Sequence, residues 1–231
     1  MPRPAVAVLA TPLVTFALAA CGAPAEDAGT PDKGHNATTS ASQSRPTTGS
    51  TDSDVWHDSV SPAEAGGSVG PDDSPCPLPV TFDVPAGWQP AALDPGDPDG
   101  DFASMTYNGD FAVACEINAG PAGPIGHLRV WVSEEQPEDL EETLGTFLRE
   151  DVSGEISERH YREKHAGDLE TVEATVLAYS DVLEEQRRTR GFIVRTPDGA
   201  AVVEYTGFDR IEHEAMVPGY IRARDSIQHT E

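Results

Sequence analysis

The first alternating run of apolar and polar residues covers residues 76–84. Every second residue is apolar, from Cys76 to Val84, and the two prolines lie near the start of the run. Successive side chains of a strand point to opposite sides, so this pattern is typical of a strand with one buried face. Prolines are tolerated at the beginning of a strand. The sequence therefore predicts a half-buried strand that opens the folded part of the chain.

A hairpin is expected at residues 105–113, because Asn108-Gly109 is a strong signal for a two-residue turn. This turn pairs Tyr107 with Asp110, and further along it pairs Phe102 with Cys115. One face of the second strand then carries Phe111, Val113, Cys115 and Ile117. Cys76 and Cys115 each occupy the same alternate positions as the apolar residues of their strands. Their sulfur atoms are therefore both expected to point towards one core.

Further strands are expected at residues 125–132, 155–165, 169–179, 188–196 and 200–206. The segment 155–165 is polar on both faces, which predicts an edge strand. In the segment 125–132, Leu128 and Val130 lie on one face. His127, Arg129 and Trp131 lie on the other face, which is either covered by a helix or lines a ligand groove.

Two helices are expected. Residues 137–151 begin with Pro137, which suits a first helical position, and they carry one apolar stripe: Leu140, Leu144, Phe147 and Leu148. The second helix begins at Asp209, whose spacing from Glu212 matches a capping box. Its inward residues are expected to be Ile211, Ala215 and Met216, with Pro218 kinking or breaking the run and His213 on an acidic surface.

This order of elements predicts an α+β fold, with a mostly antiparallel β-sheet flanked by helices. Residues 76–231 suit a single globular domain of about 155 residues with one core. Residues 21–75 are expected to be a disordered, acidic linker. In the segment 22–75, 35 of 54 residues are Ala, Gly, Pro, Ser or Thr, so it offers little apolar surface to bury.

The N-terminal segment has the features of a targeting signal. Residues 1–20 carry Arg3 and an apolar stretch of about 13 residues, which is too short to cross a bilayer. Leu18-Ala19-Ala20-Cys21 resembles the lipobox at which bacterial lipoproteins are cleaved. We therefore expect Cys21 to become the lipidated first residue, with palmitate among its fatty acids, and to anchor the chain to the extracytoplasmic face of the cell membrane. The alternative is a free secreted protein.

If Cys21 is lipidated, Cys76 and Cys115 remain as an even pair in an oxidising compartment, which favours a disulfide bond. A bridge that closes about 40 residues contributes roughly 4 kcal/mol in the chain-entropy treatment. The alternative is a pair of buried free thiols.

The charge balance is strongly acidic. The chain carries 40 Asp and Glu against 15 Lys and Arg, a net charge of −25. Such a surface repels phosphate backbones, so nucleic acid is not an expected partner.

Few residues suggest chemistry. Asp97, Asp99 and Asp101 have the spacing of a calcium loop, but the glycine and glutamate that such a loop needs are missing, so a solvated acidic loop is the first interpretation of residues 94–101. The basic cluster Arg187, Arg188 and Arg190 either receives an acidic partner or pairs with local carboxylates. We find no catalytic motif and expect no metal site and no cofactor.

Three segments resemble a group of actinobacterial lipoproteins: residues 76–88 (CPLPVTFDVPAGW), 114–117 (ACEI) and 125–131 (IGHLRVW). The motif of residues 82–88 is also similar to that of the LpqN/LpqT lipoproteins and of the wider PsbP-like fold. The resemblance covers about residues 76–228. It implies an antiparallel sheet sandwiched by helices and an accessory or interaction role, and it brings no catalytic residues with it.

Together these features predict a membrane-anchored extracytoplasmic lipoprotein that acts as a non-catalytic binding or accessory module for a cell-envelope protein. The first alternative is a carrier or sensor of an apolar or cell-wall-derived ligand, held in a groove at Trp131, Arg129 and His127. The second is an unrecognised hydrolase, which would need a deep cleft that holds a carboxylate of raised pKa.

Overall fold

The computed structural model describes residues 55–152, 154–166, 169–181 and 184–230, which belong to one compact unit, residues 48–231. The expected signal peptide (residues 1–20), the lipidation residue Cys21 and linker residues 21–54 lie outside the described residues. Within the described ranges, no helix has both the length and the apolar character that crossing a bilayer requires.

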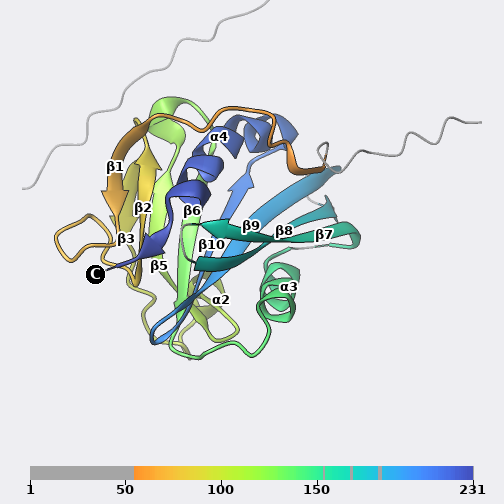
Figure 1. The fold of residues 1–231 in the computed structure, drawn as a ribbon. Helices are drawn as coiled ribbons and strands as arrows, with labels where there is room; N and C mark the ends of the chain where they lie inside the picture. The colour runs from red at the N-terminus through yellow and green to blue at the C-terminus, as the bar shows by residue number, and fades with distance from the viewer. Residues whose placement is uncertain (1–54, 153, 167–168, 182–183, 231) are drawn as a thin grey trace, which may run out of the picture. The chain divides into compact units, whose positions relative to one another are not determined.

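A large antiparallel sheet forms the centre of this unit (Figure 1). Its strands follow the order β3-β5-β6-β10-β9-β8-β7, and the short β4 pairs with β5 beside β3. The strands are β3 (Gln89–Ala92), β4 (Tyr107–Asn108), β5 (Phe111–Asn118), β6 (Gly126–Ser133), β7 (Ile156–Ala166), β8 (Leu169–Ser180), β9 (Glu185–Thr196) and β10 (Gly199–Gly207). The polar strand β7 lies at an edge, as its sequence predicts, and its charged side chains protect that edge against further pairing.

The two faces of the large sheet have different covers (Figure 1). On one face, α4 (Arg210–Ser226) packs together with a small sheet of β1 (Ala65–Val69), β2 (Val80–Pro85) and β11 (Gln228–His229). On the other face, α3 (Leu140–Asp151) packs alone against β8, β9 and the strands beside them. The helix α2 (Ala103–Thr106) and the 3₁₀ turn η1 (Gly120–Ala122) are single turns. This arrangement confirms the predicted α+β class with a mostly antiparallel sheet.

The predicted disulfide bond between Cys76 and Cys115 is present. It ties the segment before β2 to β5, and both cysteines are fully buried in the core beneath α4. The bond therefore links the small sheet covalently to the large one.

Because of a bulge at Ala114, the prediction of which β5 side chains share a face is wrong. The pairing of β5 with β6 shifts between Val113 and Cys115, so an extra residue reverses the facing of the strand. Phe111 and Val113 pack under α3, whereas Cys115 and Ile117 pack under α4. The prediction that all four residues face one core was therefore wrong, although Cys115 still meets Cys76.

The hairpin turn is displaced by one residue from its expected place. Asn108 pairs with Phe111, so Gly109 and Asp110 form the two-residue loop, and Gly109 adopts the positive φ of 56° that such a loop needs. Residues 103–106 form α2 instead of continuing the strand, and Phe102 is exposed rather than paired with Cys115.

Both predicted helices form, with corrections at their ends and faces. The first begins at Leu140 rather than at Pro137, because the Asp139 side chain accepts hydrogen bonds from the backbone N–H groups of Glu141 and Glu142 and so acts as the N-cap. Its apolar stripe is buried as expected. In the second helix Asp209 is the N-cap and accepts from the Glu212 N–H, and Pro218 lies inside a continuous helix.

The inward face of α4 was predicted incorrectly. Ile211 and Ala215 are exposed, and His213 is buried rather than on the surface. The reason is a close approach at Gly207, where a Cβ atom would lie 2.2 Å from the His213 backbone nitrogen. Because the chain passes so close to α4 at this point, the side of the helix that carries His213 and Met216 faces the sheet.

The expected linker reached residue 75, but residues 55–75 are part of the fold. Trp56 is only 1% exposed, and β1 pairs antiparallel with β2. The expectation was wrong for these residues because it rested on apolar content, and polar contacts described below hold Trp56 in place.

Candidate functional site

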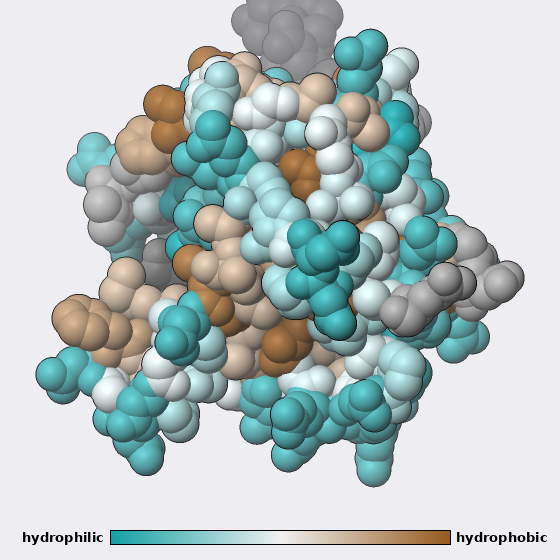
Figure 2. All heavy atoms as spheres, turned by 90° about the vertical axis from the view of Figure 1, so that its left-hand side faces the viewer, coloured by the Kyte–Doolittle hydropathy of each residue, from teal (hydrophilic) through white to brown (hydrophobic). Residues whose placement is uncertain are grey.

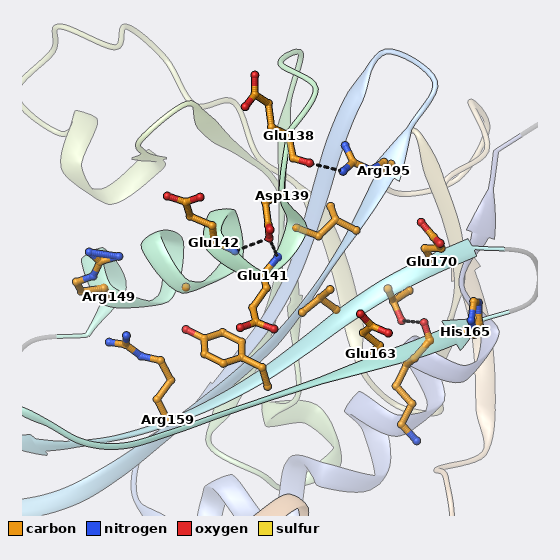
Figure 3. Close-up of a pocket in the computed structure, with 16 residues that line it drawn as sticks. Glu138, Asp139, Glu141, Glu142, Arg149, Arg159, Glu163, His165, Glu170 and Arg195 are labelled. Carbon is orange, nitrogen blue, oxygen red and sulfur yellow. Dashed lines mark hydrogen bonds between the residues drawn. The ribbon is translucent and has the colours of Figure 1, made fainter.

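One cavity of the described residues is an open groove on the face that α3 covers. It has a volume of about 630 Å³ and runs between α3, the edge strand β7 and its neighbour β8. We call it the α3 groove. Figure 3 shows charged side chains along both of its walls. Its lining comprises Glu138, Asp139, Leu140, Glu141, Glu142, Gly145, Arg149, Arg159, Tyr161, Glu163, Lys164, His165, Glu170, Thr171, Val172 and Arg195.

Tyr161 and Gly145 shape the floor of the α3 groove. Tyr161 pairs with Ala174 across β7 and β8 and packs against the core under α3. A Cβ atom at Gly145 would lie 2.5 Å from the Tyr161 hydroxyl oxygen. Glycine inside a helix costs about 1 kcal/mol relative to alanine, and here it allows the ring to lie against the helix backbone.

The charge that the α3 groove presents is mainly negative. Six carboxylates line it, against the cations Arg149, Arg159, Lys164 and Arg195. Arg195 donates to the backbone carbonyls of Pro137 and Glu138, and Arg149 donates to the Thr146 hydroxyl. Two of the four cations are therefore already engaged by the protein itself, whereas the carboxylates Glu141 and Glu142 in the first turn of α3 are exposed.

A second cavity of about 400 Å³ lies on the other side of α3, against β4 and the start of β5. It shares Glu138, Asp139 and Glu142 with the α3 groove. The N-terminal half of α3 is therefore a ridge with a hollow on each side.

The three residues proposed to form a ligand groove do not line either of these cavities. Trp131 is buried under α3, where its ring contacts Phe147 edge-on and its Nε1 donates to Glu204 at 2.9 Å. Arg129 lies along the same face and pairs with Glu116 at 3.0 Å. His127 is half-buried beyond it, and burial, with the nearby Arg129, lowers its pKa. The covering by a helix is thus the correct alternative for Trp131.

The acidic loop at residues 94–101 is closed by its own turns. Asp94 accepts from the Gly96 N–H, and Asp97 accepts from the Asp99 N–H. Among the residues that the structure describes, no group of three or more His, Cys, Asp or Glu side chains is arranged to hold a metal ion.

Figure 2 shows the side of the unit that carries β1 and β3. Apolar side chains gather in the middle of this face and hydrophilic ones border it. The exposed large apolar residues include Leu93, Phe102 and Met105, which belong to the excursion between β3 and β4.

A network of buried charges lies on the opposite face of the sheet, under α4. Glu173 of β8 is 0% exposed and contacts three arginines: Arg190 of β9 at 2.6 Å, Arg162 of β7 at 2.6 Å and Arg224 of α4 at 3.3 Å. We call these four residues the arginine cluster. Such a buried carboxylate is stable only because every side of it is matched by a hydrogen-bonding cation.

The segment Val55–Asp58, which we call the strap, closes this cluster. The Asp58 carboxylate contacts Arg190 at 2.7 Å and Arg224 at 3.3 Å, and it also pairs with Arg162. The Trp56 carbonyl accepts from Arg190, and the Arg162 guanidinium lies 3.9 Å from the centroid of the Trp56 ring. These contacts explain the burial of Trp56 in a segment whose composition suggested disorder.

The electrostatics of the arginine cluster follow from its geometry. Burial alone would raise the pKa of Asp58, but Arg190 and the other two arginines outweigh this effect and lower it to about 2. Burial likewise opposes ionisation of Glu173, and the same three arginines keep its pKa below the ordinary value. Nearby, His213 bonds to the Tyr205 hydroxyl at 2.8 Å, and burial, with the adjacent Arg188 and Arg190, lowers its pKa to about 3.

Sequence reasoning found only part of this network. The basic cluster at residues 187–190 was singled out, and Arg190 does pair with carboxylates of the protein, as one alternative held. Asp58, Arg162, Glu173 and Arg224 were missed. The signal in the sequence was Trp56 itself, because a tryptophan is unusual in a segment of small polar residues.

A family model described as an uncharacterised lipoprotein matches residues 46–227, which is most of the chain. No curated protein matches the sequence.

Proposed function

Since the chain belongs to this family of uncharacterised lipoproteins, we propose that it is a lipid-anchored, non-catalytic binding module on the extracytoplasmic face of the cell membrane. The lipid is attached at Cys21, and the folded unit presents the α3 groove to a protein of the cell envelope. The similarity to LpqN/LpqT lipoproteins and the PsbP-like fold, which the motif at residues 82–88 suggested, agrees with an accessory role.

The observation that carries the proposal is the α3 groove. It is broad, open and lined by side chains of fixed charge, which suits a polypeptide segment better than a small apolar ligand. Both cavities described above have charged walls, so the alternative of an apolar carrier has less support. Asp58 of the strap and His213 of α4 have strongly lowered pKa values, and neither of them lines the α3 groove, which fits a role without catalysis.

The charge of the groove indicates the chemistry of the partner. Because Glu138 before α3 and Glu141 and Glu142 in its first turn are exposed and line the groove, we propose that the partner presents a segment rich in Lys or Arg. Association of this kind depends on charge complementarity, so it weakens as salt screens the exposed charges.

A charge reversal tests the groove. The variant Glu141→Lys/Glu142→Lys should lose the envelope protein that the wild type retains at low salt. The matched control is Glu134→Lys/Glu135→Lys, which makes the same charge change at two exposed residues outside the groove lining. If the control loses the partner as well, or if neither variant does, the groove is not the binding site.

The anchor is tested separately. Labelling of growing cells with palmitate should mark the wild-type chain, and Cys21→Ala should remove the label and release the protein from the membrane fraction. An unlabelled wild type, or a variant that still fractionates with membranes, contradicts the proposed attachment.

A further inference from the structure

The strap contacts the arginine cluster in the way a bound peptide contacts a receptor. A backbone carbonyl (Trp56), an aromatic ring and a carboxylate (Asp58) are each recognised by arginine side chains that lie more than 100 residues away in the sequence. Peptide-recognition sites use the same combination of backbone hydrogen bonds, a side-chain pocket and a fixed anion. Arginine above an indole ring adds a cation–π contact.

The charge balance of the site is complete only with the strap. Arg162, Arg190 and Arg224 are matched by Glu173, by Asp58 and by Asp225, which pairs with Arg224 at 2.7 Å. Withdrawal of Asp58 leaves three closely spaced arginines, two of them nearly inaccessible to solvent, with one cation in excess. An unmatched buried charge is costly, so the open site would take up another anion.

The connection between the strap and the rest of the fold is exposed. Residues 59–62 are exposed, and the backbone hydrogen bond that follows them joins the Ala63 N–H to the Pro218 carbonyl. His57 adopts a φ of 53°, which is uncommon for a residue other than glycine. The strap is therefore a short docked segment on an exposed arm, a geometry that permits exchange of the segment between chains.

We propose that the arginine cluster is a binding site for an acidic peptide of the pattern Trp-x-Asp, and that the strap is the occupant that fills it in cis. The same site accepts this segment from a second copy of the chain once its own strap is displaced. This site lies on the opposite face of the sheet from the α3 groove, so it goes beyond the proposed function and does not depend on it.

The experiment uses the full chain with a protease recognition sequence inserted between Ser61 and Pro62, in the exposed arm. The protein folds with its strap in place and is cut afterwards. A fluorescent synthetic peptide of residues 51–61 is then added, and binding is measured by fluorescence anisotropy. We expect the peptide to bind the cut protein after dilution has released the strap, and not to bind the uncut protein.

Two further peptides make the result specific. A peptide with Asp58→Asn should bind about tenfold more weakly or worse, because it leaves the arginines unpaired. A peptide in which Asp58 and Ser61 are exchanged keeps the net charge of the parent and should bind as weakly as the Asp58→Asn peptide, because its carboxylate no longer has the spacing of the Trp-x-Asp pattern. Equal binding of the parent and Asp58→Asn peptides would overturn the proposal, and so would failure of the parent peptide to enter a cut protein that remains folded.

A cut protein that unfolds would also overturn the proposal, because the strap would then be an inseparable part of the core. Uncut variants give a second measurement. In the full chain with Trp56→Ala and Asp58→Asn, added parent peptide should raise the thermal unfolding temperature, whereas the wild type should show no shift. A shift of the same size in both proteins argues against the site.

Discussion

The two faces of the large sheet differ in where their charged side chains lie. Under α4, Glu173, Arg190 and Arg224 are buried and satisfied by one another and by the strap. Under α3, the core is apolar apart from the buried Glu204, which accepts a hydrogen bond from Trp131, and the charges of the groove lie at its rim. One face is sealed by a helix, a small sheet, a disulfide bond and the strap, whereas the other is covered by one helix that leaves hollows on both sides.

Because of this difference, we expect the α4 face to contribute mainly to stability and the α3 groove mainly to binding. Desolvated charges are costly to disturb, because the loss of one leaves its partners unpaired in a dry environment. Solvated charges contribute little to folding, because water and salt screen them. Substitutions on the α4 face should therefore affect the free energy of unfolding, whereas substitutions in the α3 groove should affect mainly binding.

The largest expected effect is that of Glu173→Gln. This change leaves Arg162, Arg190 and Arg224 without their central counterion and should lower the free energy of unfolding by about 3–5 kcal/mol. Urea unfolding at neutral pH measures the loss. The matched control is Glu170→Gln on the same strand, which is exposed on the groove side and should change stability by less than about 0.5 kcal/mol. Similar losses in both variants would contradict the contrast between the two faces.

Loss of the disulfide bond should come next in size. Replacement of Cys76 and Cys115 by serine, or reduction of the wild type, should lower the free energy of unfolding by about 2–4 kcal/mol. Hydrogen exchange should accelerate in β2 and β5, which the bond connects, and remain unchanged in α3. Unaltered exchange in β2 would mean that packing alone holds the small sheet in place.

Acid should destabilise the α4 face through His213. Its pKa is lowered from 6.5 to about 3 in the folded state, so the unfolded chain takes up the proton first as the pH falls below 6.5. Stability is then lost at up to about 1.4 kcal/mol per pH unit. Asp58, with a pKa of about 2, contributes only below about pH 4. Between pH 6.5 and 4.5 the loss of stability therefore comes from His213 and also from His127, whose pKa burial lowers as well.

The variant His213→Gln checks this assignment. It removes the titrating group, so its free energy of unfolding should fall less steeply between pH 6.5 and 4.5 than that of the wild type. Parallel curves for the two proteins would show that another group controls stability in this range.

Local patterns were sufficient to predict much of the fold. Alternation along residues 76–84 and the stripe from Leu140 to Leu148 depend on neighbours in the sequence, and burial follows them directly. The disulfide bond was predictable because Cys76 and Cys115 form an even pair beside Cys21, which favours a bond in an oxidising compartment. The outer position of β7 was predictable because both of its faces are polar.

The rest depends on contacts that local patterns do not contain. The bulge at Ala114 reverses the facing of half of β5, and nothing in its alternation signals the extra residue. The strap is held by Arg162, Arg190 and Arg224, which the fold brings together from β7, β9 and α4. Arginines are usually exposed, so the sequence alone predicts that all three lie in water. It therefore gives no reason to expect that they bury Trp56.

The smallest effects compare the two helix caps. Asp139 caps α3 and is exposed beside the groove, whereas the contact between Asp209 and the Glu212 N–H at the start of α4 is partly buried. Substitution of an N-cap aspartate by alanine typically costs about 1 kcal/mol. The Glu212 carboxylate also accepts from the Ile125 N–H at 2.7 Å, so fraying of this turn disturbs a contact with the start of β6 as well. We therefore expect Asp209→Ala to cost more than Asp139→Ala in urea unfolding. A larger loss from Asp139→Ala would mean that the α3 face is as tightly coupled to global stability as the α4 face.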